Sequence, residues 1–323
     1  MKDIAAEIGV SVATVSRALR NDPRQSAAMR AQVQAVATRL GYRPDPFISA
    51  WVSSRWGRTE RELGTIACIH VQSGGIWSQL LAGAEARAQV HGYRLEEFKI
   101  KEAGVTMTRL SRILVSRGIR GVCIAPLPEK GMLTLDWAEF ACATIGHSLE
   151  NPHLHRASPD QFQGMGLVLQ KVRAEGYRNI GLCLDRRVNI KVNGNWQARA
   201  LLFAEQNPDC RLNVLLVDKA KAKEEFVRWF KRCRPDVLVG SEDFVVRWAK
   251  ELGLAVPIRL LAWSAESGCA GVDERRGEVG AAAIDLIVEQ LRRNERGVPE
   301  VPKLVLIEGV WREAAGRTAI AAR

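Results

Sequence analysis

The chain of 323 residues carries 47 basic and 36 acidic side chains, a net charge of +11, and is long enough for two or three domains. It has no run of about 18 apolar residues that could cross a membrane, no secretory leader, and no Cys-x-x-Cys pair among its seven cysteines. We therefore expect a cytoplasmic protein with reduced thiols, and its charge favours a polyanionic partner without identifying one.

The first twenty residues predict two short helices joined by a tight turn. The first helix places Ile4, Ala5 and Ile8 on one face and runs into Gly9, which suits the turn. The second helix has an apolar face made by Val12, Val15 and Leu19. Its polar residues are Ser11, Thr14, Ser16 and Arg17. This pattern is typical of a helix-turn-helix, whose second helix lies in the major groove of DNA.

A third helix is predicted from about residue 26 to residue 40, with its end at Gly41. Its apolar residues fall at helical spacing and are expected to be core: Val33, Val36, Ala37 and Leu40. The chain begins Met1-Lys2-Asp3, so no Ser or Thr precedes the first helix. We expect either that Asp3 caps this helix or that the protein starts further upstream.

Three segments of this region match one family in order and spacing. They are Asp3-Ile4-Ala5, the run Val-Ser-Val-Ala-Thr-Val-Ser-Arg-Ala-Leu over 10–19, and Leu-Gly-Tyr-Arg-Pro-Asp-Pro over 40–46. Together they resemble the headpiece of the lactose-repressor family of bacterial transcription regulators. The resemblance implies an all-α helix-turn-helix domain over residues 1–43.

The family match also implies roles for the second helix. Val12 and Ala13 would lie at its start and offer apolar contact to a base, while Arg17 could bind guanine through two hydrogen bonds. The hydroxyl groups suit phosphate contacts or helix capping, and both roles are expected: Ser11, Thr14 and Ser16.

Residues 44–62 are expected to form a linker. In the family, this segment is a hinge helix that pairs with its dimer mate and inserts a leucine into the minor groove. The matching position here is Trp51, an unusual wedge residue. Two readings stay open: Trp51 contacts DNA, or Phe47 and Trp51 pack on the following domain.

From residue 63 onward, strand-like runs alternate with amphipathic helices. The expected strands are 64–71, 93–100, 121–126, 143–147, 179–184, 212–217, 236–240 and 259–263. The expected helices include 79–91, 106–117, 161–175, 196–206, 223–234 and 244–252. This alternation predicts an α/β domain built on two doubly wound parallel sheets, and hence two lobes.

This domain resembles the same family, whose large domain is similar to a periplasmic sugar-binding protein. The matching runs are 83–85 with 92–93, then 117–121, 176–181 and 271–273. The resemblance implies a two-lobed domain over 63–323 that dimerises and binds a small molecule between its lobes. Three crossings are expected near 157–160, 273–275 and 309–312. Lobe one would span about 63–157 and 275–308, and lobe two about 158–274 and 309–323.

Ligands of open α/β sheets bind at the carboxyl ends of the strands. The candidate effector residues are Trp77, His147, Asn193, Trp196, Ser241, Glu242, Trp263, Ser264 and Asp273.

At three of these places the sequence differs from the sugar-binding members of the family. Those members carry Arg near the position of Asn193, Asn-Asp at the position of Ser241-Glu242, and Asp at the position of Trp263-Ser264. The departures remove charged groups that bind sugar hydroxyls. The tryptophans could instead offer flat faces to a ring, or could simply be core: Trp77, Trp196 and Trp263. The pocket could therefore bind an unusual carbohydrate, a small molecule that is not a sugar, or no ligand, and the sequence leaves these three alternatives open.

The sequence lacks a Gly-x-Ser-x-Gly elbow and a phosphate-binding glycine loop, so we expect no catalysis. The one close histidine pair, His153-x-His155, lacks further ligands, and we expect neither metal nor cofactor. We predict a homodimeric repressor that binds a palindromic operator in double-stranded DNA under small-molecule control. Two alternatives are a DNA-binding regulator without a small-molecule effector and a cytoplasmic solute-binding protein with a vestigial headpiece.

Overall fold

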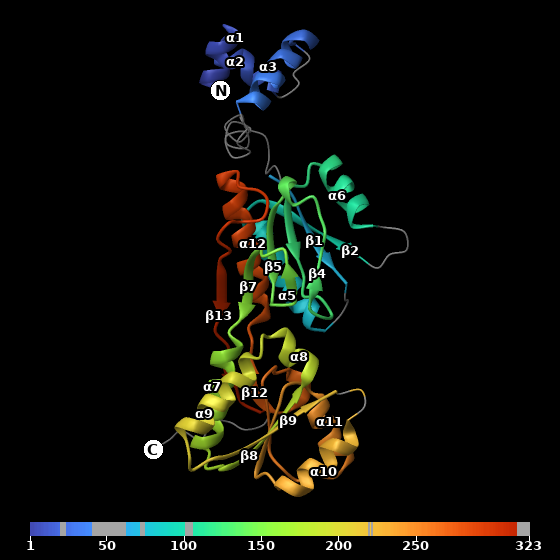
Figure 1. The fold of residues 1–323 in the computed structure, drawn as a ribbon, viewed down its shortest axis with the longest axis vertical. Coiled ribbons are helices and arrows are strands. Elements are labelled where there is room, and N and C mark those ends of the chain that lie inside the picture. The colour runs from blue at the N-terminus through green and yellow to red at the C-terminus, as the bar shows by residue number, and fades with distance from the viewer. Residues whose placement is uncertain are drawn as a thin grey trace. The chain divides into compact units, whose positions relative to one another are not determined.

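The chain divides into two compact units in the computed structural model, which describes residues 1–19, 24–40, 63–71, 75–100, 106–218, 220 and 222–314 (Figure 1). One unit comprises Met1–Leu63 with Gln290–Glu295, and the other comprises Gly64–Glu289 with Arg296–Arg323. No helix among the described residues is both long and apolar enough to span a membrane.

The N-terminal part of the first unit contains helices α1 (Lys2–Ile8), α2 (Val12–Leu19) and α3 (Ala27–Arg39). Helix α1 ends at Gly9, whose φ of 72° is the left-handed conformation that glycine adopts without strain. The Oγ atoms of Ser11 and Ser26 accept the backbone N–H groups of Thr14 and Met29, at 3.1 and 3.2 Å, and so start the next two helices.

Buried aliphatic side chains from all three helices form one small core: Ile4, Ala5, Val15, Ala18, Val33 and Ala37. The structure differs from two of the sequence predictions for these helices. Val12 and Leu40 are 43% and 46% exposed, because the buried faces of their helices are set by Val15 and Val33. Asp3 does not cap α1: the helix begins after Met1 without a side-chain cap, and Asp3 lies in its first turn.

The described residues of the second unit form two six-stranded sheets. The first sheet has the order β13-β7-β5-β3-β1-β2 and is parallel throughout. Its strands are β1 (Gly64–His70), β2 (Tyr93–Lys99), β3 (Gly121–Ile124), β5 (Ala141–Ile145), β7 (His155–Pro159) and β13 (Leu304–Ile307). A short pair, β4 (Gly131–Met132) and β6 (Leu149–Asn151), lies apart from it. We call this sheet and its helices the first lobe.

The second sheet, with its helices, is the second lobe, and its order is β14-β12-β11-β10-β8-β9. Its strands are β8 (Asn179–Asp185), β9 (Arg211–Val217), β10 (Val237–Gly240), β11 (Ile258–Leu260), β12 (Ala270–Asp273) and β14 (Val310–Arg312). Only β14 runs antiparallel to its neighbour within this sheet. Each lobe has its own buried aliphatic core.

Helices cover both sheets. They are α5 (Ile76–Val90), α6 (Met107–Ser116), α7 (Gln161–Ala174), α8 (Arg186–Lys191), α9 (Asn195–Gln206), α10 (Lys223–Cys233), α11 (Phe244–Glu251) and α12 (Arg276–Arg293). The predicted alternation of strands and helices is confirmed, and the doubly wound class with it. Four strands that the sequence did not predict, β7, β12, β13 and β14, complete the two sheets.

Within the part of the chain that the structure describes, the backbone passes between the lobes at three places. It leaves β7 for α7 at Asp160, leaves β12 for α12 at residues 274–275, and joins β13 to β14 at residues 308–309. These positions lie within a few residues of the expected crossings. Two of the connections are tied together, because the backbone N–H of Asp160 donates to the carbonyl of Ile307 at 2.8 Å.

Helices α5 and α12 approach each other unusually closely. A Cβ on Gly83 would lie 1.9 Å from the carbonyl oxygen of Gly277, and a Cβ on Gly280 would lie 2.0 Å from that of Leu80. Glycine is therefore required at both positions for the two backbones to meet.

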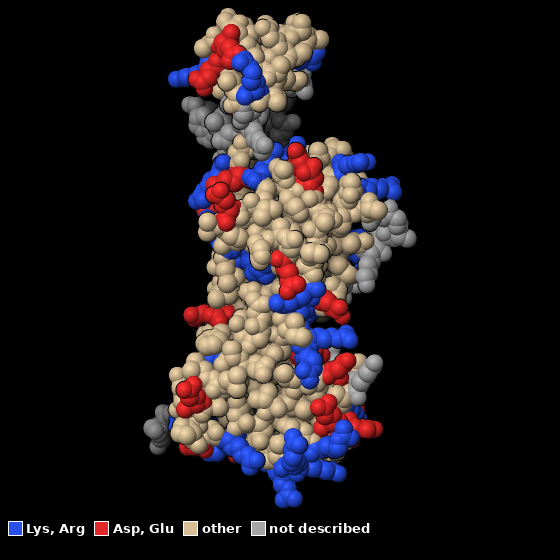
Figure 2. Space-filling model, viewed as in Figure 1, with Lys and Arg blue, Asp and Glu red and all other residues tan. Residues whose placement is uncertain are grey.

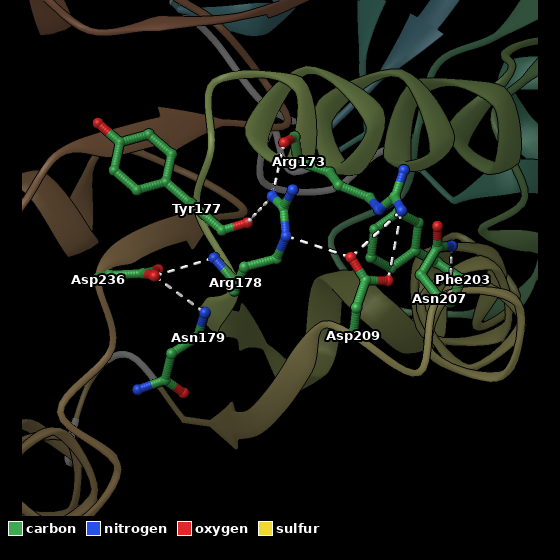
Figure 3. A network of polar contacts seen from close by, with 8 residues as sticks. All are labelled: Arg173, Tyr177, Arg178, Asn179, Phe203, Asn207, Asp209 and Asp236. Carbon is green, nitrogen blue, oxygen red and sulfur yellow. Dashed lines mark hydrogen bonds and ion pairs between the residues drawn. The ribbon is translucent and has the colours of Figure 1, made fainter.

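A polar network fixes the start of β8 in the second lobe (Figure 3). The carboxylate of Asp209 contacts the guanidinium groups of Arg173 and Arg178, each at 3.2 Å. The carboxylate of Asp236 accepts the backbone N–H groups of Arg178 and Asn179, at 2.9 and 3.0 Å. The network joins the loop after α7 to the segments before β9 and β10.

Candidate functional site

The outward face of α2 is the first candidate site. Val12, Ala13 and Arg17 are exposed along this helix, because Val15 and Ala18 take the buried positions. No hydrogen bond or ion pair joins the Arg17 guanidinium to another described residue. The face therefore presents small apolar groups beside a cation with five N–H donors, which is the chemistry that reads base edges.

The three hydroxyl side chains predicted beside this face differ in their exposure and in their hydrogen bonds. Ser11 is exposed, caps α2, and its Oγ lies 3.0 Å from the Oγ1 of Thr14. Thr14 and Ser16 are half-buried. Phe47 and Trp51 lie outside the described residues, so the linker prediction stays a prediction.

On the face of the protein that Figure 2 shows, positive charge is not confined to one region. On the face shown in Figure 2, Lys and Arg lie among Asp and Glu, and some gather at one end of the second lobe. The exposed chemistry of α2, rather than a basic patch, marks this candidate site.

A cavity of about 140 Å³ between the lobes is the second candidate site. We call it the interlobe cavity. The first lobe contributes Leu80, Pro126, Ile145, Gly146, His147, Ser148 and Pro159. The second lobe contributes Gln161, Val188, Lys191, Val192, Trp196, Glu242 and Ala262, and the crossing into α12 contributes Glu274 and Arg276. The carboxyl ends of β5, β8 and β10 lead into these segments, as expected for an open α/β sheet.

A buried ion pair lies at one wall of this cavity. The Arg276 guanidinium donates to Glu274 Oε2 at 2.9 Å and to Gln79 Oε1 at 3.3 Å. The two side chains of the ion pair are only 8% and 14% exposed. Burial raises the pKa of Glu274, and the nearby carboxylates of Glu242 and Asp273 add to this effect, whereas Arg276 opposes it. The wall thus offers both hydrogen-bond donors and acceptors.

Three of the predicted effector residues line the interlobe cavity: His147, Trp196 and Glu242. The Trp196 ring is 3% exposed and also packs in the core of the second lobe. Asn193 lines a different cavity, where its Oδ1 accepts a hydrogen bond from Lys130 Nζ at 2.6 Å.

The first lobe holds Trp77 in a structural contact. Its ring stacks on His70 with centroids 5.0 Å apart, and its Nε1 donates to Glu97 at 3.2 Å. In the second lobe, Ser241 is fully buried and accepts the backbone N–H of Asp185 at 3.0 Å.

The remaining predicted residues also make contacts within the fold. Trp263 donates through Nε1 to the carbonyl of Cys269 at 3.0 Å, and Ser264 donates to Asp243 at 3.2 Å. Asp273 accepts from Arg312 at 3.0 Å. None of these three side chains lines the interlobe cavity.

Three residues that line the interlobe cavity were not predicted from the sequence: Arg276, Gln161 and Lys191. The prediction considered only residues at the ends of strands, whereas these side chains lie in α12, α7 and α8. A signal was available for Arg276 and Gln161, because each falls in the first turn of the helix that follows a crossing. Among the described residues, no group of three or more His, Cys, Asp and Glu side chains is placed to hold a metal.

Comparisons with known proteins bear on both candidate sites. Residues 1–45 match the model of the bacterial regulatory proteins of the lacI family. The chain is 26% identical to the HTH-type transcriptional regulator GntR of Escherichia coli K12, over 94% of each protein. It is 37% identical to the HTH-type transcriptional repressor CytR of the same strain over 93 residues, 29% of this chain and 26% of that protein.

Among solved structures, the protein is similar to the transcriptional regulator CelR in complex with cellobiose. The TM-score is 0.57, with 16% identity, over 96% of this chain and 97% of the other. This likeness concerns the fold, and it extends over both units.

Proposed function

Because the chain belongs to the lacI family of bacterial regulatory proteins, we propose that it represses transcription from specific DNA sites under the control of a small molecule. The observation that carries the proposal is the helix-turn-helix unit within residues 1–45, whose second helix exposes Val12, Ala13 and Arg17. The named relatives GntR and CytR are transcription regulators and not enzymes. A cytoplasmic location follows from this role.

We propose that the DNA contacts are made by Ser11, Val12, Ala13, Thr14, Ser16, Arg17 and Trp51. Arg17 binds a guanine edge, the apolar side chains contact a base methyl group, and the hydroxyl groups bind phosphates. One headpiece reads too few base pairs to be specific in a genome, so two copies bind a palindrome as a homodimer. Residues 1–43 form the headpiece, 44–62 the linker and 63–323 the regulatory domain.

The proposed effector site is the interlobe cavity. The fold resembles that of CelR, whose structure contains cellobiose, which supports a carbohydrate as ligand. Glu242, Glu274, Lys191 and Arg276 offer hydrogen bonds to hydroxyl groups, and Trp196 offers an apolar face. At about 140 Å³ the cavity is smaller than ordinary ligand sites, roughly 300–1,000 Å³. The lobes must therefore separate to admit a sugar, which couples binding to the angle between them.

The small size of this cavity also favours one alternative, a regulator of the same kind without a small-molecule effector. Most of the predicted effector side chains are occupied by contacts within the fold, as Trp77 is by His70 and Glu97. A thermal-shift screen with mono- and disaccharides separates the two proposals. A saturable rise in Tm supports the effector, and no rise with any member supports the alternative.

The regulatory function is tested by selecting genomic fragments with the purified protein at near-physiological salt and sequencing those retained. We expect one palindromic motif. Retention without a motif that weakens steeply as salt rises would indicate phosphate contacts alone and contradict specific repression. No retention at low salt would indicate a solute-binding protein with a vestigial headpiece.

A further inference from the structure

A second cavity, of about 590 Å³, adjoins the interlobe cavity at His147, which lines both. We call it the basic cavity. It is lined by Lys130, His147, Leu149, Glu150, His153, Leu154, Arg156, Asn193, Pro302, Lys303 and Leu304. Asn193 belongs to the second lobe and the others to the first, so the basic cavity also lies where the lobes meet.

Positive charge dominates this lining. Three cations line it, Lys130, Arg156 and Lys303, against the single carboxylate of Glu150. Glu150 lies 3.5 Å from the Nζ of Lys130, and Glu289, outside the lining, lies 3.2 Å from the Nζ of Lys303.

The charge of Arg156 is fixed but not neutralised. Its two terminal nitrogens donate to the backbone carbonyls of Gly146 and Leu149, both at 2.9 Å. These acceptors are neutral, and they hold the guanidinium beside the loop that carries His147. A half-buried cation with this bonding attracts an anion without having to leave an ion pair.

His147 supplies an independent observation. Among the described residues, its Nε2 atom is buried and has no hydrogen-bond partner. Burial, together with the charges of Arg156 and Lys130, lowers the pKa of His147 to about 4. A buried polar atom without a partner costs free energy, and in the tautomer with its proton on Nε2 this atom would donate to an oxygen of a ligand.

We propose that the basic cavity binds an anionic group, a phosphate or a carboxylate, between Lys130, His147, Arg156 and Lys303. The group belongs either to a free small anion or to the ligand of the interlobe cavity, since the two cavities share His147. Only an anionic group on the ligand of the interlobe cavity rests on the proposed function. The tests of DNA binding and of anion binding can therefore give negative results independently of each other.

The experiment measures binding of inorganic phosphate and, separately, citrate to the full-length protein by calorimetry, with ionic strength held constant by chloride. Lys130→Gln removes a cation, and Lys231→Gln removes an exposed cation from α10 as a matched control.

We expect saturable binding of at least one anion to the wild type, weakened at least tenfold by Lys130→Gln. The Lys231→Gln variant should keep wild-type affinity. The proposal is overturned if neither anion binds beyond the effect of chloride, or if Lys130→Gln binds as the wild type does. An equal loss of binding in Lys231→Gln would also overturn it, because the general loss of a positive charge would then explain the result.

A second titration identifies the source of the anionic group. It compares the affinity for glucose 6-phosphate with the affinity for phosphate measured in the presence of glucose. If glucose 6-phosphate binds at least tenfold more tightly, the anionic group belongs to the ligand of the interlobe cavity. Equal affinities identify a separate anion. In both cases Lys130→Gln should weaken binding at least tenfold, because Lys130 lines the basic cavity.

Discussion

Arg17 is the single side chain on which DNA recognition should depend most. It is exposed in the last turn of α2 and is not engaged by any other described residue. Arg17→Ala should weaken binding to the selected operator by about 1–3 kcal/mol and relax the preference at one base pair. Fluorescence anisotropy with operator and point-changed operators measures both effects. Gln32→Ala, at an exposed position of α3, is the control, and equal losses in the two variants would contradict the assigned docking.

Glu274 should leave a signature in the pH dependence of stability. Burial raises its pKa in the folded protein above the ordinary value of 4.5. The folded state then holds a proton that the unfolded state has released, so stability falls as pH rises from 4.5 through the folded pKa. Glu274→Gln removes this titration, and its urea-unfolding free energy should lack that fall. A variant whose pH profile parallels the wild type would show that Glu274 titrates normally.

At the scale of elements, the packing of α5 on α12 depends on the absence of side chains. Gly83→Ala would place a methyl group against the backbone carbonyl of Gly277, which cannot move without shifting α12. We expect a loss of about 3 kcal/mol or more in urea unfolding. Gly131→Ala adds the same methyl group where nothing lies within 4 Å, and should change stability by less than about 1 kcal/mol. Similar losses in both variants would refute the close approach.

Most elements could be predicted from the sequence because their patterns are local. The eight predicted strands all exist, and α10 differs from its predicted range by one residue. The unpredicted strands β13 and β14 are short, partly exposed edge strands, defined by their neighbours rather than by their own residues. The candidate site was limited in the same way, because a sequence pattern does not contain tertiary contacts. The end of the first predicted strand indicated that Trp77 lies near the site, but it could not show that the Trp77 ring stacks on His70.

At the scale of the whole molecule, the proposed homodimer should make binding depend on both halves of the proposed operator. Replacing one half-site by unrelated sequence removes several specific base contacts, each worth about 1–3 kcal/mol. We therefore expect a loss on the order of 10²–10⁴ in affinity, measured by gel retardation at fixed salt. An operator of half the length that binds equally well would contradict the dimer and leave the helix-turn-helix assignment intact.

The three connections between the lobes have a mechanical consequence. The bond from Asp160 to Ile307 ties two of them side by side, and the third runs from β12 into α12. A change in the angle between the lobes needs backbone rotation only at these few crossing residues, which is the hinge type of domain motion. In the regulator that we propose, a ligand bound at the lobe boundary would therefore act by changing this angle.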